Sequence, residues 1–400
     1  MSFNIKEDFP IFQNNHKLIY LDSASTTQKP KQVINKLKEC YSSYNANIHR
    51  AAYSIADKAT HEYEQARANI ASFIKCNSNE IVFTKSTTES INLVAYSLAN
   101  QLNENDEIII SEMEHHRNII PWQMLQKNKK IKLRYIPVMK NGCLDLEKLY
   151  MMVNEKTQII AITQMSNILG TINPIKKIIS KIKKQYNIKF LIDAAQSIAH
   201  LPIDVKKINC DFLVFSSHKI MGPFGVGVLY AKSDLLSTMD PFLYGGHMIE
   251  KVTKTQTSWN KIPWKFEAGT GSIAEVIAFS EAINYIKKID LKNIAQHENT
   301  LLQYLIYNLK KIKNIEIYGH EEKSGPVVSF NIKNCHPYDI AKLLDTFNIA
   351  IRSGHHCSQI LMDALKINYT NRISLYIYNT KSDIDFLIKS LNQVIPLLLK

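Results

Sequence analysis

The chain has 400 residues, of which 45% are hydrophobic, so we expect a large protein of two or three domains with a substantial core. Its net charge of +13 is compatible with nucleic acid, an anionic membrane or acidic partners. The lysines, however, are scattered or fill the solvent faces of helices, as in residues 175–184, and no basic stripe with interleaved aromatic residues occurs. We therefore predict no nucleic-acid partner.

The cysteines and the N-terminal segment favour the cytoplasm. The six cysteines form no Cys-x-x-Cys pair and have no regular spacing, so we expect neither a disulfide framework nor a zinc ribbon. The first ten residues contain acids where a signal peptide needs an apolar stretch. No apolar run approaches the roughly 18 residues of a membrane span. We expect a cytosolic protein with reduced thiols and no membrane partner.

Short apolar runs alternate with helical patterns between about residues 80 and 230. The runs cover residues 81–83, 107–110, 133–136, 158–162, 190–192 and 212–215. Runs that are apolar on both faces and separated by helices predict a mostly parallel sheet covered on both sides. Ligands collect beyond the carboxyl ends of such strands. Because Asp193 and the segment 216–219 follow two of these runs, we expect a cofactor site there.

A hydroxyl-rich segment follows the first run. Residues 84–89 (Thr-Lys-Ser-Thr-Thr-Glu) open the helical pattern that begins near Ile91. Free backbone N–H groups and hydroxyls at a helix N-terminus can bind a phosphate, although an ordinary capping run with no anion has the same pattern. Ser216 and His218 would supply further donors.

Lys219 and Asp193 indicate pyridoxal phosphate. This cofactor needs a lysine for a Schiff base and a carboxylate that keeps its pyridine nitrogen protonated. Gln196 could donate to the phenolic oxygen of the ring, and the pair His115 and His116 offers an imidazole to stack on it. The alternatives are a surface lysine, a capping aspartate and a metal-binding histidine pair, although adjacent histidines seldom bind one ion.

The character of the sequence changes after Gly269. Helical patterns cover residues 273–288 and 294–312, a strand pattern covers 327–332, and a closing helix places apolar residues on one face from Ile384 to Ile395. We predict a smaller α+β domain. The expected division is a large domain of residues 17–272 and a small domain of residues 1–16 and 273–400.

A reactive thiol is predicted in the small domain. Cys357 ends the glycine-containing segment 352–357 (Arg-Ser-Gly-His-His-Cys), where two histidines and an arginine would favour a nucleophilic thiolate. An inert loop thiol and a His/His/Cys zinc corner are the alternatives. Arg372 could hold a substrate carboxylate with two parallel hydrogen bonds, or belong to a surface ion pair.

Together these motifs resemble those of the SufS-type cysteine desulfurases, also described as selenocysteine lyases, in the class V aminotransferase family. The matching segments are 20–24, 86–89, 113–116, 193–196, 215–219, 266–270 and 352–357, in order over nearly the whole chain. The resemblance implies a homodimer of fold type I with pyridoxal 5'-phosphate, a mostly parallel seven-stranded sheet in the large domain, and conversion of L-cysteine to alanine with a persulfide on the enzyme.

The resemblance also implies a role for each matching residue. Lys219 would form the Schiff base and move protons, Asp193 would pair with the pyridinium, Gln196 would contact the phenolic oxygen, and His116 would stack on the ring. The phosphate would be bound by Thr87, Thr88, Ser216 and His218, with Thr270 from the partner subunit. The substrate would contact Ala24, Asn167, Arg352 and Arg372, Cys357 would attack its sulfur, and no metal is implied.

Four departures from the family pattern are expected to alter the rate before they abolish activity. They are Ala51 with Tyr53 in place of a glycine and a second histidine, Gly271 in place of a proline, Ser217 in place of a glycine, and Ile360 in place of a proline. The resemblance further implies a SufE-like sulfur acceptor, a SufBCD-type scaffold and iron–sulfur cluster assembly. Another fold type I lyase or aminotransferase, and a scaffold protein with a degenerate site, are the alternatives.

Overall fold

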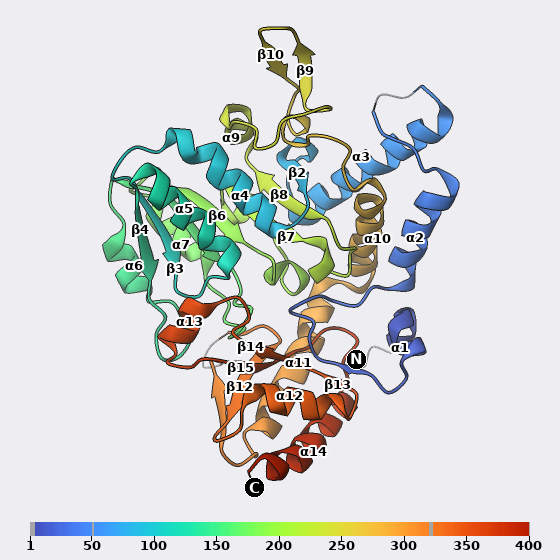
Figure 1. The fold of residues 1–400 in the computed structure, drawn as a ribbon, viewed down its shortest axis with the longest axis vertical. Helices are drawn as coiled ribbons and strands as arrows, with labels where there is room; N and C mark the ends of the chain where they lie inside the picture. Colours follow the sequence, from blue (N-terminus) through green and yellow to red (C-terminus); the bar gives the residue numbers. More distant parts are fainter. Residues whose placement is uncertain (1–4, 50–51, 320–322, 400) are drawn as a thin grey trace.

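A seven-stranded sheet forms the centre of the larger part of the molecule (Figure 1). The computed structural model describes residues 5–49, 52–319 and 323–399. In spatial order the strands are β2 (Ile81–Thr84), β8 (Gly227–Ala231), β7 (Phe212–Ser216), β6 (Lys189–Asp193), β5 (Thr157–Thr163), β3 (Glu107–Ser111) and β4 (Lys132–Ile136). Only β8 runs antiparallel to its neighbours. The mostly parallel sheet and all six predicted strands are confirmed.

The strand β8 was not predicted, because the glycines before and at the start of its apolar run, residues 228–231, are typical of a turn. Gly227 begins this strand, and a side chain there would collide with the backbone of Ser86. Glycine inside a strand often marks such a close backbone approach. Here it allows the start of α4 (Thr87–Leu98) to lie directly against the ends of β7 and β8.

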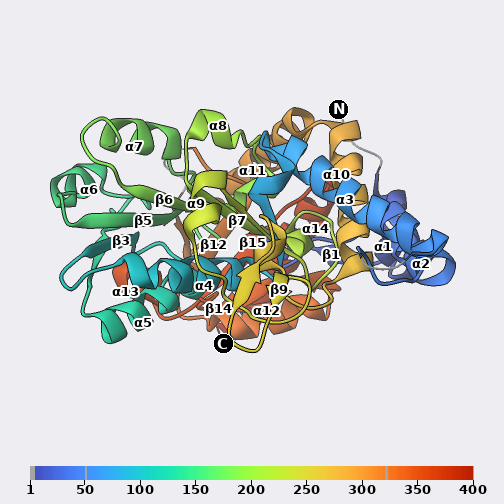
Figure 2. The same cartoon turned by 90° about the horizontal axis from the view of Figure 1, so that it is seen from above.

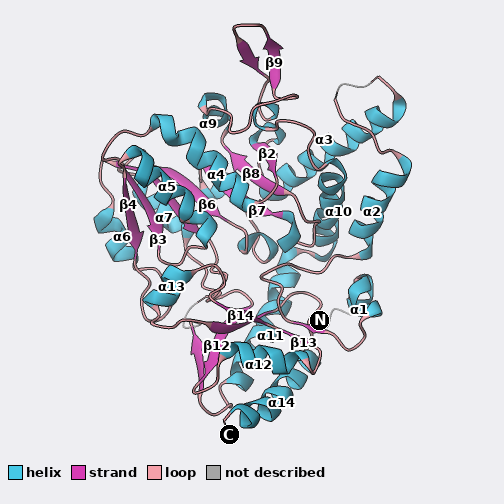
Figure 3. Ribbon diagram, viewed as in Figure 1, coloured by secondary structure: helices cyan, strands magenta, loops and turns pink. Residues whose placement is uncertain are grey.

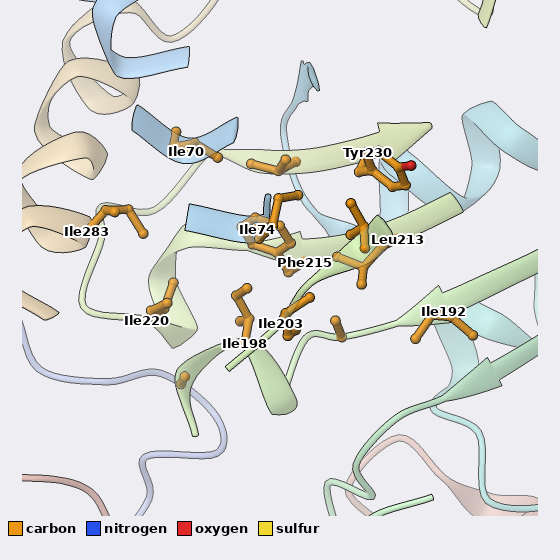
Figure 4. Close-up of a cluster of buried hydrophobic side chains, with 14 of the residues drawn as sticks. Ile70, Ile74, Ile192, Ile198, Ile203, Leu213, Phe215, Ile220, Tyr230 and Ile283 are labelled. Carbon is orange, nitrogen blue, oxygen red and sulfur yellow. The ribbon is translucent and has the colours of Figure 1, made fainter. Parts of the chain in front are cut away.

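Helices cover both faces of this sheet (Figure 2). Successive side chains of a strand point to opposite faces, so that Phe190 and Ile192 belong to one core cluster and Leu191 to the other. The first cluster includes apolar residues of α3 (Ser54–Ile74), α7 (Ile175–Ile182), α8 (Val205–Ile208) and α10 (Ile273–Ile289). The second includes those of α4, α5 (Ile120–Lys129) and α9 (Ser233–Thr238). Figure 4 shows Ile70 of α3 and Ile283 of α10 near Phe215 of β7.

The smaller domain lies below the sheet in Figure 1 and is built on four antiparallel strands. Their order is β11 (Ile315–Tyr318), β12 (Val327–Ile332), β15 (Thr370–Ser374) and β14 (Arg352–Gly354). The helices α11 (Leu291–Leu309), α12 (Pro337–Asp345) and α14 (Lys381–Leu398) share its core cluster. The helix α13 (Gln359–Ala364) follows β14 and lies between this domain and the larger sheet (Figure 3). The predicted small α+β domain is confirmed.

The N-terminal segment runs between the two domains. The helix α1 (Pro10–Asn14) precedes β1 (Ile19–Tyr20), which pairs in parallel with β13 (Ile349–Ala350) of the small domain. Leu21 lies in the core of the small domain. The next helix, α2 (Lys31–Ser43), instead packs against α10.

The predicted division at residues 272 and 273 stays a prediction, and the packing favours a later border. The helix α10 packs along α2 and α3, and its apolar residues belong to the core of the large domain. The chain reaches the core of the small domain only with α11. A border near Asp290 therefore fits the packing better.

Apart from short 3-10 helices, three further elements complete the described chain. The helix α6 (Leu146–Met152) lies between β4 and β5 in sequence. The strands β9 (Ile249–Val252) and β10 (Thr257–Trp259) form a mostly exposed antiparallel hairpin that projects from the large domain in Figure 1. Within the described ranges, none of the helices has the length and apolar character needed to cross a membrane.

Candidate active site

The N-terminus of α4 meets the end of β7. The Oγ of Ser216 accepts a hydrogen bond from the Thr87 backbone N–H at 2.8 Å and lies 2.6 Å from the Thr87 Oγ1. Ser86 caps the helix by accepting from the Glu89 N–H at 3.3 Å. Thr88 lies exposed in the first turn. The structure thus brings the predicted phosphate ligands of the two segments together at a helix N-terminus, where backbone N–H groups favour an anion.

His218 adds an open ring nitrogen next to this site. Its Nδ1 is buried and has no hydrogen-bond partner among the described residues. Its ring stacks on Phe224 with centroids 5.6 Å apart. Burial, followed by the charge of Lys219, lowers the pKa of His218 to about 3. The ring is therefore neutral at neutral pH and can donate or accept one hydrogen bond at Nδ1.

Lys219 and Asp193 lie close together at the strand ends. Lys219 ends the short 3-10 turn Ser217–Lys219 after β7, and Asp193 is the last residue of β6. Burial, and then the charge of Arg117, lower the pKa of Lys219 well below its usual value, while Asp193 acts in the opposite direction. A lowered lysine pKa favours the neutral amine, which can attack a carbonyl carbon and accept a proton.

The Asp193 carboxylate has a partner that the sequence did not suggest. Arg117 donates to it from Nε at 2.6 Å and from Nη2 at 3.0 Å. Both side chains are buried, with 7% and 0% of their surface exposed. Arg117 follows the histidine pair in the same turn. Sequence reasoning missed it because a lone arginine after a histidine pair carries no motif.

Gln196 and Ala24 are brought together by a direct contact. The Gln196 Nε2 donates to the Ala24 carbonyl at 2.8 Å. The Ala24 N–H in turn donates to the Oγ of Ser374 in the small domain at 2.9 Å. The N-terminal segment therefore connects the ring side of the site to the small domain.

The two adjacent histidines have different neighbours. The pKa of His115 is lowered by burial and then by the charges of Arg117 and Lys219, which places its ring close to the lysine. The His116 N–H instead donates to the Cys357 carbonyl at 2.8 Å, and its Nε2 accepts from the Gln359 N–H at 3.3 Å. The prediction that His116 stacks on a cofactor ring stays untested, and this geometry favours His115 for that position.

Cys357 lies on a loop whose backbone is fixed while its side chain is exposed. His356 and Cys357 have φ angles of 51° and 57°, and Gly354 has 137°. The Asn167 Nδ2 donates to the His356 carbonyl at 3.0 Å, and the His356 Nε2 lies 3.0 Å from the Thr370 Oγ1. Because Cys357 itself is exposed, its thiol is accessible to another molecule.

Arg352 and Arg372 share one carboxylate. The Asp22 Oδ2 accepts from the Arg352 Nε at 3.1 Å, and its Oδ1 accepts from the Arg372 Nη2 at 2.9 Å. Arg372 also donates from Nη1 to the Asn167 carbonyl at 3.0 Å. Its Nε is buried and unpartnered among the described residues. A buried guanidinium with an open donor is suited to an incoming carboxylate.

Thr270 lies apart from these contacts. It is an exposed residue in a loop that lines a cavity of about 430 Å³ together with Thr84, Lys85 and Glu89. The loop is anchored by Glu267, which accepts from Arg67 at 2.7 Å and 2.9 Å. The role predicted for Thr270, in the site of a partner subunit, stays a prediction.

The departures from the family pattern fall in different environments. Ser217 is buried, and its Oγ donates to the carbonyls of Pro223 and Val226, so a hydroxyl is well accommodated there. Tyr53 is 51% exposed at the start of α3. Gly271 borders the cavity beside Thr270. Ile360 packs against the second core cluster. Ala51 lies outside the described residues.

Metal binding was an alternative for the histidine pair and for the Cys357 loop. In the part of the chain that the structure describes, no three side chains of His, Cys, Asp or Glu are grouped so that they could hold a metal ion.

Comparisons with known proteins find relatives over almost the whole chain. The aminotransferase class-V family model matches residues 19–387. A cysteine desulfurase of Wigglesworthia glossinidia brevipalpis is 47% identical over 403 residues, covering 98% of each chain. The apo structure of a cysteine desulfurase from Thermococcus onnurineus NA1 has a TM-score of 0.94 at 37% identity and 98% coverage of both chains. The cysteine desulfurase CsdA of Escherichia coli, in an S-sulfonic acid form, has a TM-score of 0.92 at 33% identity, covering 99% of this chain and 100% of its own.

Proposed function

Since the chain belongs to the aminotransferase class-V family and its relatives are cysteine desulfurases, we propose that it removes sulfur from L-cysteine and passes it to Cys357. Family members depend on pyridoxal 5'-phosphate, and the fold is that of fold type I enzymes. The products would be alanine and a persulfide on Cys357. That persulfide would then supply an acceptor protein.

The residues around Lys219 fit pyridoxal 5'-phosphate. A phosphate needs donors, and the site offers the N-terminus of α4 with Thr87, Thr88 and Ser216, together with the unpartnered Nδ1 of His218. The aldehyde needs a neutral amine, and the lowered pKa of Lys219 favours that form. We assign Asp193 to the ring nitrogen, Gln196 to the phenolic oxygen and His115 to the ring face. When bound, this cofactor would act as an electron sink for the substrate.

The substrate carboxylate is assigned to Arg372. The Nε of this guanidinium is buried and open, while its other two nitrogens are oriented by Asp22 and the Asn167 carbonyl. A planar guanidinium held in this way binds a carboxylate with little further ordering. Arg352, on the other side of Asp22, and Ala24, which holds Gln196, complete the proposed substrate side.

Cys357 is assigned as the sulfur acceptor. Its Sγ would attack the sulfur of the substrate, forming an S–S bond as the bond between that sulfur and its carbon breaks. Lys219 would return a proton to the carbon side. The observation that carries this assignment is the hydrogen bond from the His116 N–H to the Cys357 carbonyl, because it docks the cysteine loop on the turn that holds His115 and Arg117 beside Lys219.

Product analysis with three proteins tests the proposal. The wild type, loaded with cofactor and given L-cysteine and a thiol reductant, should form alanine and sulfide in equal amounts. Cys357→Ala should keep the spectral change on adding L-cysteine but release no sulfide. Lys219→Ala should lose the borohydride-sensitive visible band. Normal sulfide release by Cys357→Ala, or an amino-group transfer product in place of alanine, would favour another lyase or an aminotransferase.

The partners belong to the same proposal. We expect a homodimer, in which Thr270 completes the phosphate site of the partner subunit, and transfer of sulfur to a SufE-like acceptor that feeds a SufBCD-type scaffold for iron–sulfur cluster assembly. The exposed Cys357 supports a protein acceptor, since its thiol can be reached from outside. Radioactive sulfur from labelled L-cysteine should move from the enzyme to an added acceptor. Label that stays on the enzyme would contradict sulfur transfer to this acceptor.

Selenocysteine would fit the same residues, because selenium would replace the atom that Cys357 attacks. Alanine formation from each amino acid, with and without the acceptor, measures the preference. We place the protein in the cytoplasm, which the six free cysteines support, since disulfides are rare in that compartment.

A further inference from the structure

We propose that Arg117 is a positioning residue for the cofactor. Its guanidinium orients the Asp193 carboxylate and partly neutralises the negative charge of that carboxylate. This inference rests on the proposed function, because it concerns the carboxylate that would meet the ring nitrogen. The ring nitrogen would then face a carboxylate that is hydrogen-bonded to a guanidinium.

The geometry leaves one position open on the carboxylate. The Asp193 Oδ1 accepts from the Arg117 Nη2 at 3.0 Å and from the Ala195 N–H at 3.0 Å, while Oδ2 accepts, among the described residues, only from the Arg117 Nε at 2.6 Å. A carboxylate oxygen accepts about two hydrogen bonds. Oδ2 therefore keeps one acceptor position for a further donor, and the two bonds from one planar group fix the direction in which it points.

The location of this ion pair argues for a role beyond packing. A buried pair of this kind is seldom more stabilising than apolar residues of similar volume, because both charges lose their hydration. Arg117 and Asp193 come from different elements, the turn after β3 and the end of β6, and meet beside Lys219. An ion pair of weak net stability at the cofactor lysine is better explained by what its charges do there.

Arg117 acts on the other ionisable groups of the site. Its charge lowers the pKa of both Lys219 and His115, second in each case to burial. Among the described residues, the other charged or ionisable groups that act on or feel these residues are Asp193, Glu114, His116, His218, Arg352 and Arg372. Removing the guanidinium would leave Asp193 without its nearest cation and would let the protonated forms of neighbouring bases become more stable.

The test compares Arg117→Ala with the matched control Arg117→Lys, which keeps the charge but loses the planar two-point contact. Each protein is titrated with pyridoxal 5'-phosphate, and the visible band of the bound cofactor is followed from neutral to alkaline pH. In Arg117→Ala the pH midpoint of the spectral change should rise by about one unit, because a nearby positive charge is lost. In Arg117→Lys the midpoint should stay near that of the wild type.

The cofactor dissociation constant supplies a second readout. It should increase about tenfold in Arg117→Ala and increase also in Arg117→Lys, since only arginine fixes both oxygens. An unshifted midpoint with lower thermal stability alone would show a purely structural pair. Tighter cofactor binding by Arg117→Ala would show that the arginine blocks the site. Either result would overturn the inference.

Two further outcomes keep the test decisive. If Arg117→Ala does not fold, Arg117→Lys carries the test, and an unchanged dissociation constant in that variant would overturn the inference. If the wild type itself forms no borohydride-sensitive band, the proposed function fails and this inference with it. A normal wild-type band with unshifted variants contradicts the role of Arg117 only.

Discussion

His115 and His116 are neighbours in sequence that serve different parts of the site. His115 lies near Lys219 and Arg117, whereas His116 holds the Cys357 loop through its backbone N–H and its ring nitrogen. One turn of chain thus links the proposed ring site to the proposed sulfur acceptor. This arrangement gives the pair a direct test, because each substitution is the control for the other.

We predict opposite phenotypes for His115→Ala and His116→Ala. His115→Ala should change the absorption spectrum of the bound cofactor and weaken its binding, because the imidazole that would stack on the cofactor ring is lost. The second should leave the spectrum unchanged but slow persulfide formation, because the Gln359 N–H loses its acceptor at a stability cost of about 1 kcal/mol. Absorption spectra and single-turnover sulfur transfer measure the two effects. A spectral change in His116→Ala alone would restore the assignment made from the sequence.

At this scale Lys219, Asp193, Gln196 and Cys357 could be predicted as site residues, because each follows a strand or lies in a recognisable motif, and their roles stay predictions. Arg117 and Asp22 were missed for a physical reason. Their roles depend on contacts with Asp193 and Arg372, which are 76 and 350 residues away in sequence. No local pattern encodes such contacts, and a buried arginine looks in sequence like any surface arginine.

At the level of elements, Glu114 connects the ends of two strands to the turn that carries Arg117. This buried carboxyl accepts from the Ser111 Oγ, from the Thr163 N–H at 2.9 Å and from the Asn118 Nδ2 at 2.8 Å. Burial raises the pKa of Glu114 to about 7, although these donors oppose the shift. The folded protein therefore binds this proton more tightly than the unfolded chain, in which the pKa is near 4.5.

This shift predicts a pH dependence of stability. Between pH 4.5 and about 7 the folded state keeps the proton that the unfolded chain has lost, so the contribution of Glu114 becomes less favourable as the pH rises. The change should total about 3 kcal/mol and level off above the folded pKa. Glu114→Gln cannot titrate and should lack this slope.

Urea unfolding of the wild type and Glu114→Gln across this range measures it. The lost hydrogen bond in the variant adds an offset that does not depend on pH, so only the slope is diagnostic. Parallel stability curves for the two proteins would contradict the raised pKa.

The elements themselves were predicted well where the apolar pattern was continuous. Helices α7, α10, α11 and α14 and the six sheet strands follow from periodicity, which reports which face is buried. The strand β8 was missed although residues 228–231 are apolar, because Gly227, which the close approach of Ser86 requires, looks in sequence like part of a turn. The two-residue strands β1 and β13 were also missed, since their pairing depends on how the two domains meet.

At the level of the whole molecule, a buried contact between a histidine and a carboxyl group joins the two domains. The His200 Nδ1 lies 2.9 Å and 3.0 Å from the two carboxylate oxygens of Glu298 on α11, and both side chains are buried. The His200 ring also meets Tyr376 edge to face, with centroids 5.4 Å apart. Burial raises the pKa of Glu298, and His200 opposes this rise.

We predict that His200→Ala destabilises the protein by about 1–3 kcal/mol at neutral pH, because it leaves the buried Glu298 carboxyl group without its hydrogen-bond partner. The double variant His200→Ala with Glu298→Gln should recover part of the loss. The cost of the single variant should also shrink at acidic pH, where Glu298 takes up a proton. Denaturant unfolding of the wild type, His200→Ala, Glu298→Gln and the double variant measures the free energy of unfolding of each and so the interaction between the two side chains. A cost below about 1 kcal/mol, or no recovery in the double variant, would contradict the pairing.

The two-domain plan followed from the change of pattern after Gly269, but the border could not be fixed from the sequence. The helix α10 is apolar on the face that packs against α2 and α3, and a buried face looks the same in whichever core it lies. The connection of the N-terminal segment to the small domain likewise depends on long-range pairing of β1 with β13.

The most direct test of the proposed function is the fate of the sulfur atom in a single turnover. The cofactor-loaded enzyme is mixed with less than one equivalent of L-cysteine without reductant, and its mass and peptides are analysed. We predict that the wild type gains one sulfur atom on the peptide that contains Cys357, with one alanine formed for each, and that Cys357→Ala gains none. Sulfur on any of the other five cysteines, or equal sulfur gain by Cys357→Ala, would contradict it.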